Sequence, residues 1–335
     1  MIHGSVAAVV VAFGSDTDRL DRCLGALSAQ GAHVVLVDNG SPTPVTHPLA
    51  AVVVRRERND GFAAGVNAGL RVCDRPFVAI VNDDAVFQDG ALAACVDALD
   101  AAPDSVLAAA PKVMFPDGAH IDSVGLALRS SGEAFSAGVG QPDIGQFDED
   151  RAVLGPCLSA AVFRRDAFDR IGVLDERYFL YYEDVDWALR CFLSGHETLF
   201  VPSARVFHEH AATTRSLGER RRFRLVERNL LLCATANLSV RSTIRIWVGR
   251  VVVAAKAAIK GPDRTSRAIA LASAAARVPA VLPVRRRNRS RAQIADREAF
   301  RSAEGLTPYV DVDTYTPARP EAALLAAQAR LRRGR

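Results

Sequence analysis

Apolar runs alternate with helix-spaced segments over the first third of the chain. Val6 to Phe13 is a continuous apolar run, as in a strand buried on both faces. Asp18 to Gln30 places leucines at helical spacing. This alternation predicts an α/β domain with a mainly parallel sheet and right-handed crossovers. The expected strands are 6–13, 33–37, 52–54, 77–81, 158–163 and 198–201, and the expected helices are 18–30, 62–72, 91–101, 165–170 and 188–194.

Composition narrows the class of protein. The 335 residues are 49% apolar and 24% charged, which suits a folded, soluble domain with a large core. Six scattered cysteines form no CxxC pair, as expected of buried free thiols in a reducing compartment. No basic stretch precedes an apolar run at the N-terminus, and no uninterrupted apolar stretch approaches the ~20 residues that cross a bilayer. We therefore expect a cytoplasmic location.

The charge is unevenly distributed along the chain. Residues 241–291 hold thirteen Lys or Arg and one acid, Asp263, so they carry +12 and leave −8 for the rest of a chain of net +4. Valine, alanine and isoleucine are interleaved with the arginines, which is typical of a helix lying on anionic lipid. A nucleic-acid patch is an alternative, although no nucleic-acid-binding motif accompanies it, and a solvated appendage or dimer contact is another. We favour peripheral membrane contact at the inner face of the cell membrane, with no nucleic-acid partner.

Polar clusters follow three of the predicted strands, at the edge where parallel sheets bind ligands. Asp38 ends the second strand, where a carboxylate can accept the imide N–H of a pyrimidine base. Small residues from Asn59 to Gly69 open a helix, where backbone amides can approach a phosphate. In Asn82-Asp83-Asp84, paired carboxylates can bind a ribose and a divalent cation. Each cluster also has a structural alternative, namely a helix cap or Asx turn, glycine packing, and an ordinary turn.

The segment from Gly172 to His208 contains the densest group of chemically useful side chains. Glu183, Asp184 and Asp186 stand among aromatic residues, directly before a helix-like segment. Burying carboxylates against an apolar wall is costly, but it can raise the pKa of a general base and hold it in place.

Two further stretches add candidates. Val206-Phe207-His208-Glu209-His210 offers an imidazole that could complete a metal shell with Asp84, although a lone surface histidine is commoner. His208 and His210 are both candidates. The glycine-rich stretch from Phe115 to Leu154 is weakly periodic, which predicts a functional loop region.

In this order along the chain, the clusters resemble the inverting family 2 glycosyltransferases, most closely bacterial rhamnosyltransferase-type members. The resemblance spans about Val6 to Thr214, and the Gly172-to-His208 block is its most specific part. It implies a GT-A fold over residues 1–214, with a nucleotide-sugar half (1–112) and an acceptor half (113–214). A basic helical extension (215–300) and a poorly ordered tail (301–335) would follow.

The resemblance also implies a role for each site residue. Asp38 would bind the base, Asn59, Gly61 and Asn67 would lie along the ribose and diphosphate, and Asp83 would contact the ribose. Asp84 and His208 would hold Mg²⁺ or Mn²⁺. Asp184 would be the general base, and Glu183 and Asp186 would shape the substrate site.

The implied function is metal-dependent, inverting transfer of a sugar from a dTDP- or UDP-sugar donor. Rhamnose from dTDP-rhamnose is the favoured sugar, the acceptor would be a glycan or lipid-linked glycan, and the process would be cell-envelope polysaccharide synthesis. A sugar nucleotidyltransferase is one alternative, but Phe13-Gly-Ser-Asp16 lacks the basic residues expected after its first strand. A non-catalytic scaffold of glycosyltransferase type is the other, although it would not need Asp84, Asp184 and His208.

Overall fold

The N-terminal half of the chain forms the predicted parallel sheet. The computed structural model describes residues 4–209, 218–260 and 264–306. Four strands lie in the order β4-β1-β2-β3, and every neighbouring pair is parallel. They are β1 (Val6–Ala12), β2 (His33–Asp38), β3 (Val52–Arg55) and β4 (Phe77–Asn82). Their carboxyl ends therefore meet along one edge of the sheet, where the candidate site residues were expected.

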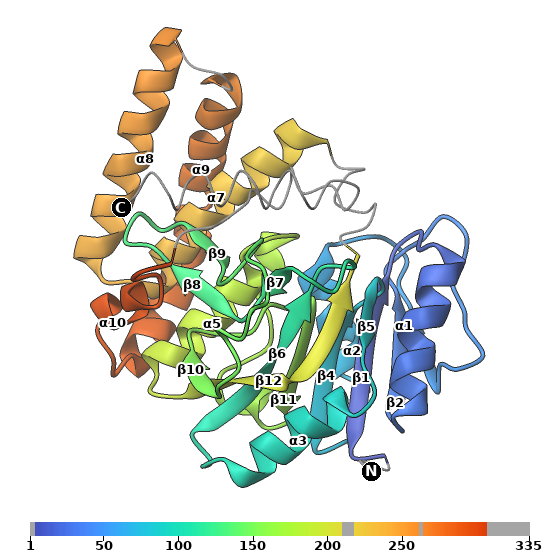
Figure 1. Cartoon of the computed structure of the whole chain (residues 1–335). Coiled ribbons are helices and arrows are strands. Elements are labelled where there is room, and N and C mark those ends of the chain that lie inside the picture. The colour runs from blue at the N-terminus through green and yellow to red at the C-terminus, as the bar shows by residue number, and fades with distance from the viewer. Residues whose placement is uncertain (1–3, 210–217, 261–263, 307–335) are drawn as a thin grey trace.

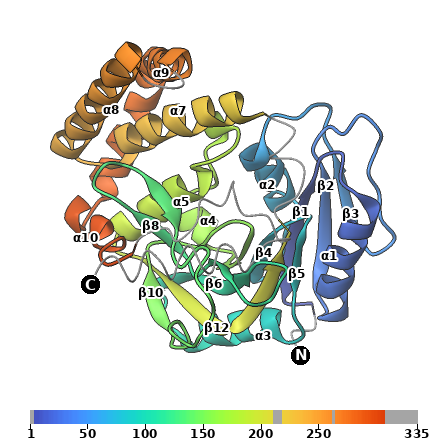
Figure 2. The same cartoon turned by 45° about the horizontal axis from the view of Figure 1, so that its top comes forward.

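Helices cover both faces of this sheet (Figures 1 and 2). The apolar sides of α1 (Thr17–Ala29) and α3 (Ala91–Ala101) pack on one face. The other face is covered by α2 (Phe62–Leu70), α4 (Ala167–Arg170) and α5 (Glu183–Leu193).

Close packing explains two of the glycines in α2. A Cβ atom on Gly65 would lie 2.6 Å from a methyl carbon of Val11, and one on Gly69 would lie 2.4 Å from Val9. Glycine therefore lets the helix approach β1, which is the structural alternative that the sequence left open for these two positions.

A mixed half extends the sheet beyond β4. The strand order continues β4-β11-β6-β12-β10, in which β11 is antiparallel to both neighbours and β12 is parallel to β6. The short β5 pairs with β12, β7 pairs with β6, and β8 pairs with β9 in a separate sheet. The bounds are β5 (Ala85–Phe87), β6 (Val106–Met114), β7 (Ile121–Ser123), β8 (Leu126–Leu128), β9 (Ala134–Ser136), β10 (Arg151–Val153), β11 (Ala160–Arg164) and β12 (Glu197–His208).

Three elements differ from the sequence prediction. Residues 115–154, expected to be loops, contain β7 to β10, whose three residues each are too few to show an alternating pattern. β12 continues to His208, past the predicted end at Val201, because a register shift between Val201 and Arg205 absorbs Pro202. α5 begins at Glu183 instead of Ala188, so the acidic cluster forms the first turn of this helix.

The predicted helical extension is confirmed for the described residues. It consists of α7 (Glu219–Asn237), α8 (Val240–Lys260) and α9 (Arg264–Arg291), followed by α10 (Asp296–Arg301). Leu230 and Leu231 of α7 share a core with Val185 and Leu189 of α5, while α8 and α9 project beyond the sheet (Figure 1). The predicted domain boundaries stay predictions, and residues 307–335 of the predicted tail lie outside the described residues.

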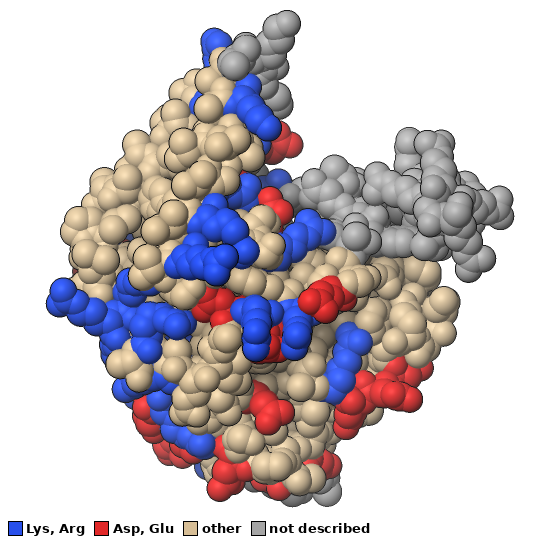
Figure 3. Space-filling view, turned by 90° about the vertical axis from the view of Figure 1, so that its left-hand side faces the viewer, with Lys and Arg blue, Asp and Glu red and all other residues tan. Residues whose placement is uncertain are grey.

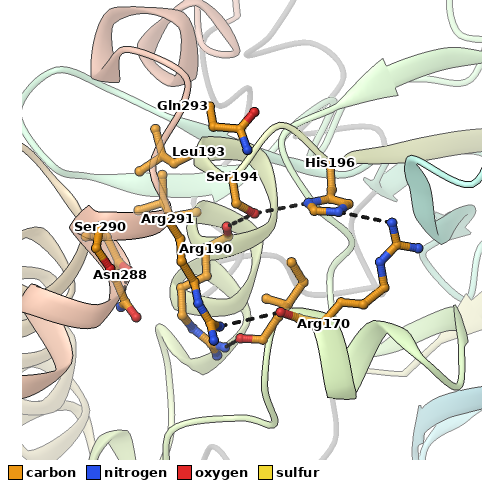
Figure 4. Close-up of a pocket in the computed structure, with 12 residues that line it drawn as sticks. Arg170, Arg190, Leu193, Ser194, His196, Asn288, Ser290, Arg291 and Gln293 are labelled. Atoms are coloured by element: carbon orange, nitrogen blue, oxygen red, sulfur yellow. Dashed lines mark hydrogen bonds between the residues drawn. The ribbon is translucent and has the colours of Figure 1, made fainter.

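A pocket of about 260 Å³ lies at the contact between α5 and the C-terminal helices (Figure 4). The guanidinium groups that line it are largely hydrogen-bonded to backbone carbonyls. Arg190 donates to the carbonyls of Ile171 and Val173, and Arg170 donates to the carbonyl of Asp104. The pocket is at the carboxyl end of the 11-residue α5, roughly 16 Å along the helix from the acidic first turn. It therefore belongs to the interhelical contact and not to the candidate active site.

Candidate active site

Strand pairing brings Asp84 and His208 together from distant parts of the sequence. The turn after β4 leads into β5, which pairs antiparallel with the end of β12 so that Ala85 lies opposite His208. As a result, Asp84 Oδ1 lies 3.2 Å from His208 Nε2. Both residues are buried. The structure therefore places the two predicted metal ligands side by side, whereas His210 lies outside the described residues.

Asp122, which the sequence did not single out, holds the other side of the imidazole. It comes from β7, and its Oδ2 lies 2.8 Å from His208 Nδ1. Burial alone would lower the pKa of His208, but the carboxylates of Asp84 and Asp122 outweigh it and raise this pKa well above its usual value. The protonated imidazole donates Nδ1–H to Asp122 and Nε2–H to Asp84. A cation bound at Asp84 would replace the Nε2 proton, while Nδ1–H stays on Asp122, as in histidines that bind metals.

The spacing of these groups suits a hexacoordinate divalent cation. Ligands at 2.0–2.1 Å in neighbouring octahedral positions are about 3.0 Å apart, close to the 3.2 Å between Asp84 Oδ1 and His208 Nε2. Within the described residues no cluster of three or more His, Cys, Asp or Glu could hold the ion. A cation held here would therefore take its remaining ligands from water and the donor diphosphate.

Asp83 lies beside this pair on the same turn. The hydroxyl of Ser15, from the loop after β1, donates a hydrogen bond to Asp83. Burial and the neighbouring charge of Asp84 raise the pKa of Asp83 to about 6. The side chain is half-buried, so the ribose contact predicted for Asp83 stays a prediction that this position allows.

The first turn of α5 carries the candidate base. Burial raises the pKa of Asp184 to about 6. Burial and the charge of Asp184 raise the pKa of Glu183 to about 8, and within the described residues its Oε2 has no hydrogen-bond partner. Burial, and then the charges of Asp184 and Asp122, raise the pKa of the Cys157 thiol to about 11. The Cys157 thiol therefore lies within electrostatic range of both the candidate base Asp184 and Asp122.

The backbone leading into this turn is strained. Phe179, Tyr181 and Tyr182 have positive φ angles of 67°, 69° and 72°, a conformation that costs a bulky residue about 1–3 kcal/mol. At Phe179 the chain makes a γ-turn, in which the N–H of Leu180 donates to the carbonyl of Tyr178 at 2.8 Å. Such strain persists only where surrounding contacts impose it, and it is commonest at functional sites.

Asp186 is held by internal partners, and the site-shaping role predicted for it stays a prediction. Its carboxylate is 1% exposed and pairs with Arg190 Nε at 2.9 Å. It also accepts hydrogen bonds from Tyr178 Oη at 3.1 Å and from Asn237 Nδ2 at 2.7 Å. The carboxylate therefore joins α5 to α7 and to the segment before α5, which is a structural role.

Asn67 is also held by internal partners, and the donor contact predicted for it stays a prediction. Its amide donates to the carbonyl of Leu174 and to Glu176, both at 2.9 Å, and its oxygen accepts from the N–H of Leu174. The side chain is 3% exposed, so it fastens α2 to the segment before α5.

Asn59 and Gly61 shape the loop that enters α2. The Asn59 side chain accepts from the N–H of Gly61 at 2.9 Å and from Asn39 Nδ2 at 3.2 Å. Gly61 has a φ of 99°, and a Cβ there would lie 2.1 Å from the carbonyl oxygen of Phe179. Only glycine fits this approach. The donor contacts predicted for both residues stay predictions.

Asp38 ends β2 with its carboxylate fully buried. The N–H groups of Ser41 (2.9 Å) and Val45 (2.8 Å) donate to it, and Arg55 pairs with it. Burial alone would raise the pKa of Asp38, but the hydrogen-bond donors around the carboxylate lower it below its usual value. A base imide would therefore share this carboxylate with internal partners, and base binding by Asp38 stays a prediction.

Comparisons with known proteins identify the relatives of this chain. Residues 7–172 match the family model of glycosyl transferase family 2. The chain is 28% identical over 242 residues to an N-acetylglucosaminyl-diphospho-decaprenol L-rhamnosyltransferase of Mycobacterium tuberculosis, covering 62% of this chain and 76% of that protein. It is 22% identical over 214 residues to a dTDP-rhamnosyl transferase of Shigella flexneri, covering 62% and 70%.

A solved structure, GalNAc-T7 with UDP, GalNAc and Mn²⁺, shares the fold, with a TM-score of 0.58 at 14% identity. The match covers 73% of this chain and half the length of that protein. The family match favours a glycosyltransferase over the nucleotidyltransferase and the scaffold considered above. The chain is therefore a family 2 glycosyltransferase enzyme with a GT-A fold and a rhamnosyltransferase-like sequence.

Proposed function

We propose that this enzyme is a metal-dependent, inverting glycosyltransferase that uses dTDP-rhamnose and acts in cell-envelope polysaccharide synthesis. The contact between Asp84 and His208, with Asp122 behind the imidazole, is the observation that carries the proposal. Both relatives are named as rhamnosyl transferases, which supports rhamnose as the sugar, and the name of the Shigella relative supports dTDP as the nucleotide. The mycobacterial name supports a lipid-linked N-acetylglucosaminyl diphosphate as the acceptor.

The residues divide the chemistry between two sides of the site. Asp84 and His208 would hold Mg²⁺ or Mn²⁺, which when bound offsets the negative charge of the departing diphosphate. Asp83 would accept from a ribose hydroxyl, and Asn59 and Gly61 would present the loop beside the nucleotide.

Asp184 would take the proton of the acceptor hydroxyl. A base works best when its pKa is near the working pH, and burial has moved this carboxyl to about 6. With the base on one side and the diphosphate leaving on the other, attack from the face opposite the leaving group inverts the anomeric carbon.

Calorimetry of donor binding tests the donor half of the proposal. Wild type, Asp84→Ala and the exposed control Asp89→Ala would be titrated with dTDP-rhamnose, UDP-sugars and GDP-mannose, with and without Mn²⁺. We expect Mn²⁺-dependent binding of a pyrimidine nucleotide sugar by wild type and Asp89→Ala, and at least a 10-fold loss in Asp84→Ala. Binding of no nucleotide sugar by folded wild type would contradict the proposal.

We also propose that the helical extension contacts the membrane that holds a lipid-linked acceptor. Along one side of α8, Val240, Ile244, Val248, Val251 and Val252 expose 44–63% of their surface. Arg241, Arg245 and Lys256 are exposed at the edge of this stripe. Figure 3 shows a broad uncharged area on this side of the molecule, bordered by Lys and Arg. Apolar side chains with a basic rim suit the surface of an anionic bilayer.

Among the described helices, α9 is long and apolar enough to cross a membrane by length and composition. The sequence interpretation had found no such segment, because arginines and prolines interrupt α9. Ala274 and Val281 of α9 pack in the core that α9 shares with α7, and 17% of its most apolar window is buried. The proposed contact is peripheral, at the inner face of the membrane.

Vesicle sedimentation tests the membrane contact. The double variant Ile244→Ser/Val248→Ser should bind vesicles containing phosphatidylglycerol at least 10-fold more weakly than wild type. Val253→Ser is the matched control, because Val253 is also exposed but lies about 180° around α8 from Ile244. Equal binding by the double variant and wild type would contradict this part of the proposal.

A further inference from the structure

One side chain of α7 holds the strained turn that precedes α5. Asn229 is fully buried, although it belongs to the C-terminal helices and not to the sheet. Its Nδ2 lies within hydrogen-bond distance of three carbonyls of the turn, those of Tyr178 (3.0 Å), Leu180 (2.9 Å) and Tyr181 (2.7 Å), which share its two N–H groups. These carbonyls form no regular ladder, because the backbone around them has positive φ angles. The amide therefore takes the place of secondary-structure hydrogen bonds.

Arg228 fixes the orientation of this amide. Its Nε donates to Asn229 Oδ1 at 2.8 Å, and its Nη2 donates to the carbonyl of Tyr178 at 2.9 Å. The oxygen of Asn229 is thus occupied, and the NH₂ group is left facing the turn. Two neighbouring residues of α7 together supply the donors that the turn needs.

The turn connects the two sides of the active site. Phe179 accepts, at its carbonyl, a hydrogen bond of 2.7 Å from the N–H of Phe62, at the start of α2. The backbone of Gly61 lies against Phe179 at the same point. At its other end, Tyr182 is the N-cap of α5, so the turn determines where α5 begins and hence where Asp184 lies in its first turn.

We propose that Asn229, oriented by Arg228, is a positioning residue for Asp184, so that the C-terminal helices form an integral part of the active site. This inference rests on the proposed role of Asp184 as the base. Without the amide donors, the positive-φ residues would relax toward ordinary conformations, since the remaining hydrogen bonds to the turn would repay less of their strain. The first turn of α5 would then move relative to the acceptor hydroxyl.

Asn229→Ala tests this inference, with Thr235→Val as the matched control. Thr235 is also a buried polar residue of α7, but its hydroxyl bonds to Leu231 and Trp247 and does not touch the turn. We expect kcat to fall at least 10-fold in Asn229→Ala, because a shift of about 1 Å can cost 100-fold. The dissociation constant of dTDP-rhamnose should change less than 3-fold, and Thr235→Val should retain wild-type kcat.

The pH profile distinguishes positioning from a general loss of packing. Among the described residues, Glu183, Cys157 and Cys233 are titratable groups within electrostatic range of Asp184. If the first turn of α5 loosens, Asp184 becomes better solvated, so the acid limb of kcat/KM should move to lower pH in Asn229→Ala. An unmoved acid limb, or a loss of kcat equal to that of Thr235→Val, would overturn the inference.

Hydrogen–deuterium exchange separates this inference from the proposed function, because it needs no turnover. Amides 180–185 should exchange at least 10-fold faster in Asn229→Ala than in wild type or Thr235→Val. Unchanged exchange would overturn the inference even if the enzyme transfers rhamnose. If Asn229→Ala does not fold, Arg228→Met is the second variant. It removes the hydrogen bonds from Arg228 to the Tyr178 carbonyl and to Asn229 Oδ1, so it should show the same changes to a smaller extent. No change in Arg228→Met would then overturn the inference.

Discussion

Replacing Asp122 by Asn tests how His208 is prepared for a metal ion. The Asp122 Oδ2 to His208 Nδ1 distance of 2.8 Å joins two buried side chains, and Asn keeps the size while removing the charge. A charge-assisted hydrogen bond contributes roughly 1.5 kcal/mol more than a neutral one, which corresponds to about 10-fold in affinity. Residues behind metal ligands typically contribute 10–100-fold. We therefore expect Mn²⁺ affinity to fall 10–100-fold in Asp122→Asn.

The assay is a titration of Mn²⁺ in the presence of dTDP, followed by the electron paramagnetic resonance signal of the free ion. Asp143→Asn is the control, since Asp143 is a mostly buried carboxylate paired with Lys112 and Arg205 instead of His208. Turnover at saturating Mn²⁺ should stay within about 3-fold of wild type, because Asp84 and His208 remain. Wild-type Mn²⁺ affinity in Asp122→Asn, or an equal loss in Asp143→Asn, would refute the reasoning.

Three further predictions concern the segments around the site. The log of kcat/KM should fall with unit slope below pH 6, where Asp184 becomes protonated, and Asp184→Asn should lower kcat at least 100-fold, as measured by product formation. The pKa of Glu183, about 8, exceeds the ~4.3 of an unfolded glutamate, so stability falls as pH rises between these values. Glu183→Gln should therefore raise the melting temperature at pH 8.5 but not at pH 4, and an equal rise in the exposed control Glu197→Gln would count against this. Gly61→Ala should lower the melting temperature by several degrees, because its methyl group would meet the backbone of Phe179; an unchanged value would show that the loop can move aside.

The parallel half of the fold was predictable from the sequence because its elements are long and regular. β1, β2 and β4 are buried apolar runs, and the helices between the strands place leucine or alanine at helical spacing. The edge strand β3 is a short run of valines that is only half-buried. The pairing of Asp84 with His208 was predictable only from resemblance, since it depends on β5 joining β12 across most of the domain.

Other parts of the site could not be predicted, for identifiable reasons. Asp122 lies in a three-residue strand within a glycine-rich stretch, so no period distinguishes it from a loop residue. Asn67 and Asp186 carry the residue types expected at a ligand site, but tertiary contacts to Leu174 and Arg190 occupy them. Asn229 lies within a helix whose sequence gives no indication of the strained turn that it faces.

The anomeric configuration of the transferred sugar tests the central claim most directly. Wild-type enzyme would be incubated with dTDP-rhamnose, Mn²⁺ and a lipid-linked N-acetylglucosaminyl diphosphate, and the product examined by NMR. We predict a rhamnosyl product whose anomeric configuration is inverted relative to the donor, formed with Mn²⁺ or Mg²⁺ and not in excess EDTA. A product with retained configuration, or equal turnover in EDTA, would contradict the account.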